Sequence, residues 1–77
     1  MRDFFFVYIL ISESNPGRRY TGLTHNLERR LHAHNSGQVA HSARFRPWRL
    51  ETAVAFRSRP KSRCFEVYLK IHSGRAF

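Results

Sequence analysis

The sequence predicts a small α/β (α+β) fold, in which helices flank a three-stranded antiparallel sheet of strand order 2-1-3. Its 77 residues suit a single domain, residues 1–77, with one thin core. Residues 4–11 are apolar on both alternating faces, which indicates a strand covered on both sides. Residues 48–57 alternate apolar with mostly polar positions, which indicates a half-exposed edge strand. We therefore expect the first strand to lie between the other two.

The second strand follows a turn. Residues 12–17, "SESNPG", contain Asn, Pro and Gly, each of which has its own turn chemistry. Residues 19–23 then suit the hairpin partner of the first strand. Gly22 within this strand predicts the close approach of another backbone or of a ligand, because a side chain there would occupy the space.

The first helix is predicted from a cap at Thr24 or Asn26 to about His34, and "NSG" at residues 35–37 ends it. At about 100° per residue, one face of the helix collects four side chains: Leu27, Arg30, Leu31 and His34. Two others point to solvent: Arg29 and His32. Arg30, unlike its neighbour in sequence, therefore borders the core.

Residues 37–47 are loop-like, and "RFRPWR" at residues 44–49 interleaves cations with aromatic rings. This composition is typical of nucleic-acid contacts, in which arginines hold phosphates and an aromatic ring stacks on an unpaired base. Trp48 is equally suited to anchor the core. Both alternatives stay open for this residue.

The last helix is predicted to begin within "SRPKSR" at residues 58–63, with Pro60 in its first turn and Gly74 beyond its end. Four residues are predicted to form its inward stripe: Cys64, Phe65, Tyr68 and Leu69. Glu66 flanks this stripe, where it also fits an ion pair with Lys70 one turn further on. Because the chain stops at "GRAF", we expect a basic tail or helix to follow in a longer protein.

The charge of the chain indicates a polyanionic partner. The formal net charge is +9, and all cations except Lys61 and Lys70 are arginines, whose planar forks match phosphate oxygens. A solvated cationic surface is the alternative. The one cysteine, Cys64, excludes an internal disulfide and fits a reducing compartment such as the cytoplasm, and we expect it to pack in the core. The apolar run at residues 4–11 is too short to span a membrane, so no membrane partner is expected.

The acids and histidines argue against two kinds of metal site. A two-metal phosphodiesterase needs several converging carboxylates, but the acidic residues are scattered: Asp3, Glu13, Glu28, Glu51 and Glu66. A zinc site needs regularly spaced ligands, and His32 and His34 face different ways. Only Glu66 borders a core, and a glutamate in this position, taken alone, is more often an ion-pair partner of Lys70 than a metal ligand.

Four segments occur in an order that resembles a known family. They are "VYIL", "YTG", "LTHNLERRLHAH" and "FEVYLK", and together they resemble the GIY-YIG nuclease superfamily, especially its small standalone bacterial members. The first half-motif reads "FVY" and the second "YTG", so only the tyrosines and the final glycine of the name-giving motifs are present. Taken singly, Tyr8 and Tyr20 are also ordinary strand tyrosines.

The resemblance implies a set of site residues. The catalytic candidates are Tyr8, Tyr20, Arg30, His34 and Glu66, and Gly22 is the closing glycine of the second half-motif. Glu66 matches the metal-binding glutamate, and His41 matches a second histidine of some branches. Together with the basic loop, the candidates for nucleic-acid binding are His41, Arg44, Arg46, Trp48, Arg49 and Lys70.

The activity implied is hydrolysis of DNA phosphodiester bonds by a cytoplasmic endonuclease that uses one Mg²⁺ or Mn²⁺ held by Glu66, phosphate oxygens and waters. Tyr8 is the expected base, its pKa lowered by Arg30 and His34, and Tyr20 positions the water or phosphate; these two roles are exchangeable. His34 relays a proton or contacts a phosphate. Processing of structured or branched DNA, as in repair, is the expected setting. The alternatives are an RNA-directed nuclease and a binding module without catalysis.

Overall fold

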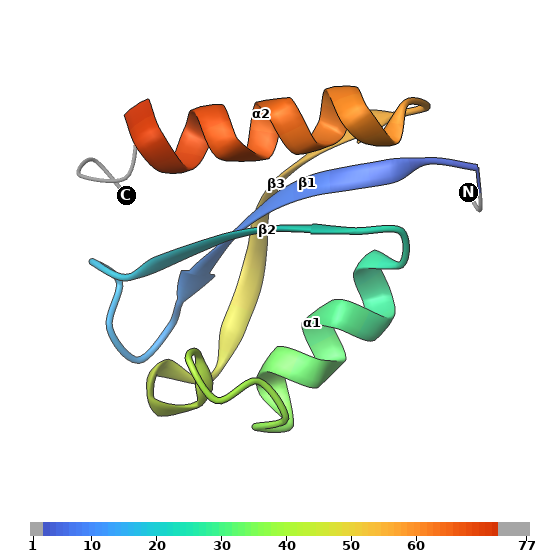
Figure 1. The fold of residues 1–77 in the computed structure, drawn as a ribbon. Coiled ribbons are helices and arrows are strands. Elements are labelled where there is room, and N and C mark those ends of the chain that lie inside the picture. Colours follow the sequence, from blue (N-terminus) through green and yellow to red (C-terminus); the bar gives the residue numbers. More distant parts are fainter. Residues whose placement is uncertain (1–2, 73–77) are drawn as a thin grey trace.

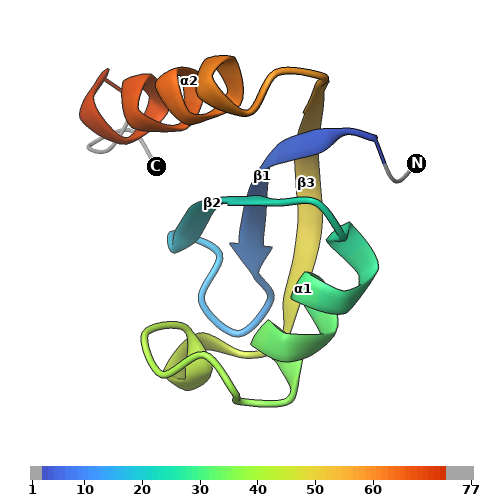
Figure 2. The same ribbon diagram turned by 45° about the vertical axis from the view of Figure 1, so that its right-hand side comes forward.

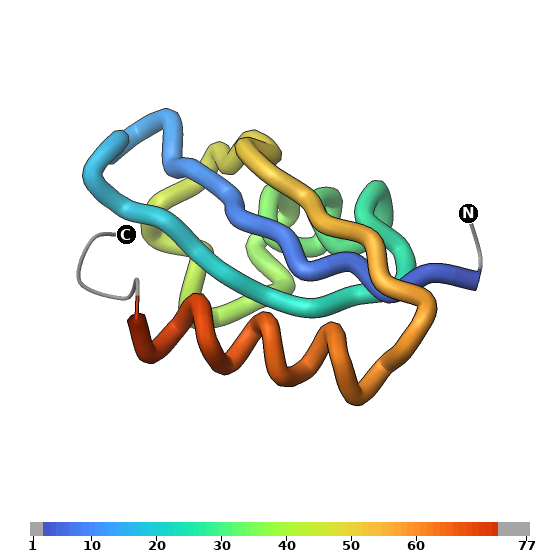
Figure 3. The backbone as a smooth tube through the Cα atoms, turned by 90° about the horizontal axis from the view of Figure 1, so that it is seen from above, coloured from blue at the N-terminus to red at the C-terminus, as the bar shows by residue number. Residues whose placement is uncertain are grey.

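The computed structural model describes residues 3–72 and contains a three-stranded sheet between two helices (Figure 1). The elements in chain order are β1 (Phe5–Ser12), β2 (Arg19–Thr24), α1 (Leu27–Asn35), the 3₁₀ helix η1 (Ala43–Phe45), β3 (Trp48–Phe56) and α2 (Arg59–His72). The strands are antiparallel in the order β2-β1-β3, which confirms the predicted order. Figures 1 and 2 show α2 on one side of the sheet and α1 on the other. Figure 3 shows that α2 runs along the β2 side.

The central strand β1 sends alternate side chains to the two helices. Every residue from Val7 to Ser12 is buried, as expected for a strand between two neighbours. Tyr8 and Leu10 form a core cluster on the α1 side, whereas Val7 and Ile9 point to the other face, toward α2. The burial of both faces is the reason the strand lacks polar alternation.

A bulge in β3 corrects the prediction of one continuous apolar face on that strand. Ile9 of β1 pairs with Thr52, but the next residue, Leu10, pairs with Leu50, so one residue of β3 is skipped. An inserted residue reverses the sense of alternation. Leu50 therefore lies on the α1 side, whereas Phe56 contacts α2, with its ring centroid 5.5 Å from that of Phe65.

Both ends of α1 are fixed by asparagines. Of the two predicted caps, Asn26 is the one used, because its side-chain oxygen accepts the Arg29 N–H at 3.1 Å. At the other end, Asn35 donates to the carbonyl of Trp48 at 2.9 Å and accepts its N–H at 2.6 Å. Gly37 follows with φ of +84°, a conformation that favours glycine. The end of α1 is thereby joined to the start of β3.

The inward face of α2 differs from the predicted stripe. Ser62 and Glu66 are its buried residues, while Cys64 is exposed and Tyr68 is 54% exposed. Phe65 and Leu69 are half-buried, in agreement with the prediction. The apolar pattern missed Ser62 and Glu66 because both are polar. The hydroxyl of Ser62 donates to the carbonyl of Arg59, and the carboxylate of Glu66 is paired with cations, so both side chains can be buried against the sheet.

Two further expectations concern the ends and the membrane. The predicted end of the last helix at Gly74 lies outside the described residues. Among residues 3–72, no helix combines the length and the apolar character needed to cross a bilayer.

Candidate active site

The side chain of Tyr8 lies directly against Gly22. The two residues are paired across β1 and β2, and a Cβ at Gly22 would overlap the hydroxyl and ring of Tyr8. The predicted close approach at this glycine is therefore made by a side chain rather than by a backbone or a ligand. Without a side chain at this position, β2 leaves room for the phenol.

Two residues of α1 reach the hydroxyl of Tyr8. Arg30 donates from Nε to the phenol oxygen at 3.2 Å, and His34 Nε2 lies 3.1 Å from the same oxygen. The other ring nitrogen of His34, Nδ1, lies 2.6 Å from the Oγ of Ser42 in the loop that follows α1. Tyr8, His34 and Ser42 are 2%, 0% and 1% exposed, so this chain of hydrogen bonds is almost entirely removed from bulk solvent, with Tyr8 at its most exposed end.

Tyr20 completes the cluster from β2. Its ring centroid lies 4.6 Å from that of His34 in an edge-on arrangement, and 6.4 Å from that of Tyr8. The side chain is half-buried, unlike that of Tyr8. Four of the five predicted catalytic residues, Tyr8, Tyr20, Arg30 and His34, therefore lie together on the α1 side of the sheet.

The electrostatics of this cluster differ from the expectation of an acidified phenol. Burial raises the pKa of Tyr8, and the hydrogen bond and charge of Arg30 oppose this effect without overcoming it. Burial, followed by the charge of Arg30, lowers the pKa of His34 to about 4. His34 is therefore neutral near pH 7 and adds no positive charge. Tyr8 is a neutral phenol in the free protein.

Glu66, the fifth predicted catalytic residue, lies on α2, which covers the other side of the sheet from α1, and its carboxylate is already paired. Arg63 NH1 lies 2.7 Å from one of its carboxylate oxygens and Lys70 Nζ 3.1 Å from the other. The ion pair with Lys70 is the alternative to a metal-ligand role that the sequence predicted for Glu66. The negative charge of Glu66 is the smallest of the causes that raise the pKa of Tyr8.

A divalent ion would find a single protein carboxylate here. Among the described residues, no three or more His, Cys, Asp or Glu side chains gather to hold a metal. The Glu66 side chain is 6% exposed, whereas those of Arg63 and Lys70 are 66% and 51% exposed. Glu66 fits a hard cation that keeps most of its waters and takes its other ligands from a phosphate.

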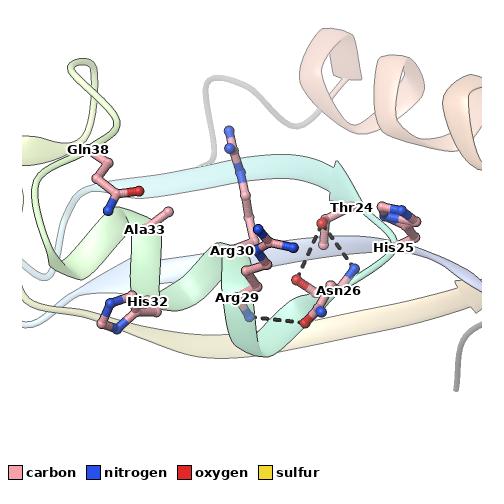
Figure 4. Close-up of a pocket in the computed structure, with 8 residues that line it drawn as sticks. All are labelled: Thr24, His25, Asn26, Arg29, Arg30, His32, Ala33 and Gln38. Carbon is pink, nitrogen blue, oxygen red and sulfur yellow. Dashed lines mark hydrogen bonds between the residues drawn. The ribbon is translucent and has the colours of Figure 1, made fainter.

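A hollow of about 730 Å³ lies beside Arg30 on the surface of α1 (Figure 4). It is lined by Thr24, His25, Asn26, Arg29, Arg30, His32, Ala33 and Gln38. None of these lining residues is acidic. Arg29 and His32 are exposed as predicted, but they line this basic hollow, so they are more than an ordinary charged surface.

The predicted nucleic-acid contacts lie in the loop, at the start of β3 and on α2, and they divide into exposed and buried residues. The exposed ones are His41, Arg44, Arg46, Arg49 and Lys70. Arg46 donates from Nε to the carbonyl of Ala43 at 2.8 Å, and Arg49 pairs with Glu13 at 3.6 Å. Trp48 is 4% exposed and donates its indole N–H to the carbonyl of Ser42 at 2.9 Å. Of the two alternatives for Trp48, a core anchor or a stacking platform for a base, the structure shows the core anchor, because the buried ring has no exposed face on which a base could stack.

The sequence did not single out Ser42, Asn35 or His25. Ser42 lies eight positions after His34 in the sequence, in the loop beyond α1, and no local pattern separates it from other loop serines. Asn35 was seen only as part of a helix end. His25 lines the hollow from the connection between β2 and α1. Its spacing from the other histidines in the sequence does not mark it as a functional residue.

Comparison with known proteins identifies the family of this chain. Residues 4–76 match the family model of the GIY-YIG catalytic domain. The chain belongs to the GIY-YIG family. UPF0213 protein BH0048 of Halalkalibacterium halodurans is 38% identical over 69 residues, covering 88% of this chain and 73% of the relative. UPF0213 protein SAG0778 of Streptococcus agalactiae is 36% identical over 64 residues, covering 82% of this chain and 73% of the relative.

The family assignment has consequences for function. A GIY-YIG catalytic domain implies a nuclease-type function and a nucleic-acid substrate. The resemblance inferred from the ordered motifs is confirmed, and the sheet of order 2-1-3 is consistent with the GIY-YIG fold. No solved structure gives a significant match to the chain.

Replacing Gly22 by alanine is expected to destabilise the protein by about 1–3 kcal/mol, because the new methyl group overlaps the Tyr8 phenol. Urea unfolding measures the loss. Gly17→Ala is the matched control, since a Cβ at Gly17 meets only Asn15 Oδ1 at 3.8 Å. Equal stability of Gly22→Ala and Gly17→Ala would contradict the proposed packing.

Acid is expected to weaken the fold through His34. Its pKa is lowered from 6.5 to about 4 in the folded protein. Between these two pH values the unfolded chain binds a proton at this histidine and the folded chain does not. Above pH 6.5 the histidine is neutral in both states and the free energy of unfolding keeps its full value. As the pH falls toward 4, the free energy of unfolding decreases by at most on the order of 3 kcal/mol. Unfolding of wild type and His34→Gln at about pH 7.5 and about pH 4.5 measures it. The same loss in both proteins would exclude His34 as the cause.

Proposed function

We propose that this protein is a divalent-metal-dependent endonuclease that hydrolyses DNA phosphodiester bonds. The observation that carries the proposal is the position of Arg30, which lines the basic hollow and also donates to the buried Tyr8–His34 pair. A phosphate bound in the hollow would contact the same guanidinium that orients the phenol. Charge that develops on the phosphate would then be stabilised beside the proton-accepting groups.

Arg30 can serve both purposes at once. A guanidinium has five N–H donors in a fixed fork, and the Tyr8 oxygen uses the one on Nε. A further hydrogen bond with Tyr20 engages part of the fork, and the other terminal N–H groups are left for a non-bridging phosphate oxygen. The neighbouring Arg29, His25 and His32 would hold adjacent phosphates of the strand.

The proton of the attacking water needs an acceptor, and a free phenolate is not required. The Tyr8 oxygen has a lone pair left after accepting from Arg30. As the water oxygen bonds to phosphorus, its proton passes to Tyr8 while the Tyr8 proton passes to His34 Nε2. The P–O bond to the leaving group breaks, and the leaving oxygen takes a proton from solvent. By family resemblance the products carry a 5′-phosphate and a 3′-hydroxyl.

Binding of the phosphate would also favour this transfer. The charge of Arg30 is one of the two causes that lower the pKa of His34. An anion next to Arg30 offsets that charge, so His34 becomes a better proton acceptor when substrate is present. Tyr20, whose ring packs edge-on against His34, would position the water or the phosphate. A divalent ion on Glu66 would offset negative charge on the scissile phosphate and the leaving oxygen.

The second candidate function is a nucleic-acid-binding module without catalysis. Two observations favour it: both carboxylate oxygens of Glu66 are occupied by cations, and the pKa of Tyr8 is raised rather than lowered. An RNA-directed nuclease would use the same groups as the DNA enzyme. One set of assays separates these possibilities.

The nuclease proposal predicts that Tyr8→Phe lowers the rate of cleavage by at least about a hundred-fold, because the proton path is lost. Cleavage of duplex, nicked, flapped and branched DNA, and of RNA, is measured in Mg²⁺ and in Mn²⁺. Tyr68→Phe, at an exposed tyrosine of α2, is the matched control and should retain full activity. A larger loss in Tyr20→Phe than in Tyr8→Phe would show that the two tyrosines exchange roles.

Glu66→Gln in the same assays should abolish metal-dependent cleavage, with Glu51→Gln as its control. Binding of every substrate without cleavage would reject the enzyme and leave the binding module. Preferential cleavage of RNA would reject the DNA substrate alone.

The hollow beside Arg30 is expected to bind phosphates of the strand. Arg29→Gln should weaken binding of DNA of any sequence and reduce the slope of log K against log salt by about 1. Lys61→Gln removes the same charge from an exposed position on α2 and is the control. Equal slopes for the two variants would show that the strand does not pass through the hollow.

A further inference from the structure

Ser42 is a buried serine with a contact that no family motif assigned to it. Its Oγ lies 2.6 Å from Nδ1 of His34 and 3.3 Å from the carbonyl oxygen of Val39. Its own carbonyl accepts the indole N–H of Trp48 at 2.9 Å, and its N–H donates to Val39 at 3.2 Å. The residue is 1% exposed. Bonds from both its backbone groups therefore fix the position of this hydroxyl.

Only one arrangement of protons uses every donor in the chain of hydrogen bonds. Arg30 donates to the Tyr8 oxygen and has no lone pair with which to accept. The Tyr8 proton must then go to His34 Nε2, so the proton of the neutral imidazole is on Nδ1. Nδ1–H donates to Ser42 Oγ, and the Ser42 hydroxyl donates to Val39.

The other tautomer leaves a buried donor without an acceptor. If His34 carried its proton on Nε2, it would donate to the Tyr8 oxygen, and Ser42 would donate to Nδ1. The Tyr8 hydroxyl proton would then lack an acceptor among residues 3–72, although the side chain is 2% exposed. An unpaired buried donor is costly. The Nδ1–H tautomer is therefore favoured, and Ser42 is the acceptor that it needs.

We propose that Ser42 is a positioning residue that holds His34 in the Nδ1–H tautomer, so that Nε2 is free to take the proton of Tyr8. This assignment rests on the proposed nuclease function for its catalytic consequence. When Nε2 gains the proton, the Nδ1–H bond to Ser42 stays in place, so the ring does not have to turn. The second nitrogen of a catalytic histidine commonly has such a partner, which sets the tautomer and the ring orientation.

The first measurement is independent of any cleavage. The two-bond ¹⁵N–¹H correlation spectrum of the His34 ring near pH 7 reports which nitrogen carries the proton. In wild type it is expected to show Nδ1 protonated and Nε2 unprotonated. In Ser42→Ala the Nδ1 donor has no hydroxyl partner, and the spectrum should shift toward the Nε2–H form. An Nε2–H tautomer in wild type would overturn the proposal.

The second measurement is the rate of cleavage. Ser42→Ala is expected to lower kcat by at least about ten-fold with KM nearly unchanged, because proton transfer is affected and phosphate binding is not. Ser42→Thr keeps the hydroxyl and should restore most of the rate. Ser36→Ala is the matched control: its hydroxyl also donates to a backbone carbonyl, that of Ala33 at 3.2 Å, but from an exposed position. Thermal unfolding of each variant shows that it is folded.

The two measurements separate failure of this proposal from failure of the nuclease function. An unchanged tautomer and kcat in Ser42→Ala would overturn the role of Ser42, even in an active nuclease. A tautomer that shifts in Ser42→Ala, in a protein that cleaves no substrate, would uphold the positioning of His34 and reject the nuclease. Equal losses of kcat in Ser42→Ala and Ser42→Thr would show that packing, and not the hydroxyl, is what the reaction needs.

Discussion

The packing of the Tyr8 ring against Gly22 is the constraint on which the site depends. It occurs because the register of β1 and β2 sets these residues opposite each other. A slip of one residue would turn Tyr8 to the α2 face, away from Arg30 and His34. The pairing of Leu10 with Tyr20 in the same register brings the second tyrosine onto the same face. One glycine and one register therefore determine where both phenols lie.

A second constraint is the joining of α1 to the loop and to β3. Asn35 bonds both backbone groups of Trp48, and the indole of Trp48 bonds Ser42, which in turn contacts His34. Each of these bonds spans a loop, so the loop is held against the core although it contains little regular structure. The burial that lowers the pKa of His34 follows from this closure. Trp48 thus supports the candidate site indirectly, as part of the core behind it.

The two charged parts of the site are balanced differently. Arg30 lies between a neutral buried pair and the basic hollow, whose lining residues include no carboxylate. Glu66 is held between Arg63 and Lys70, whose side chains are more than half exposed. In the proposed nuclease, an incoming phosphate would supply the negative charge that Arg30 lacks, and the carboxylate of Glu66 would hold a divalent ion. The free protein is thus arranged for a polyanion, in keeping with its net charge of +9.

The strand order, the helix face that carries Arg30 and His34, and the family were determined by the sequence alone. The periodicity of apolar residues and the order of motifs along the chain can both be identified without knowing which distant atoms come into contact. The sequence misjudged the buried face of α2 and the alternation of β3, since a buried ion pair and a bulge both run against the apolar pattern. Only the tertiary structure decided that Tyr8 is buried and neutral, and that Ser42 is the partner of His34. The pKa of a group and a contact across a loop depend on which distant atoms exclude water or accept a proton, and this is settled only when the chain has packed.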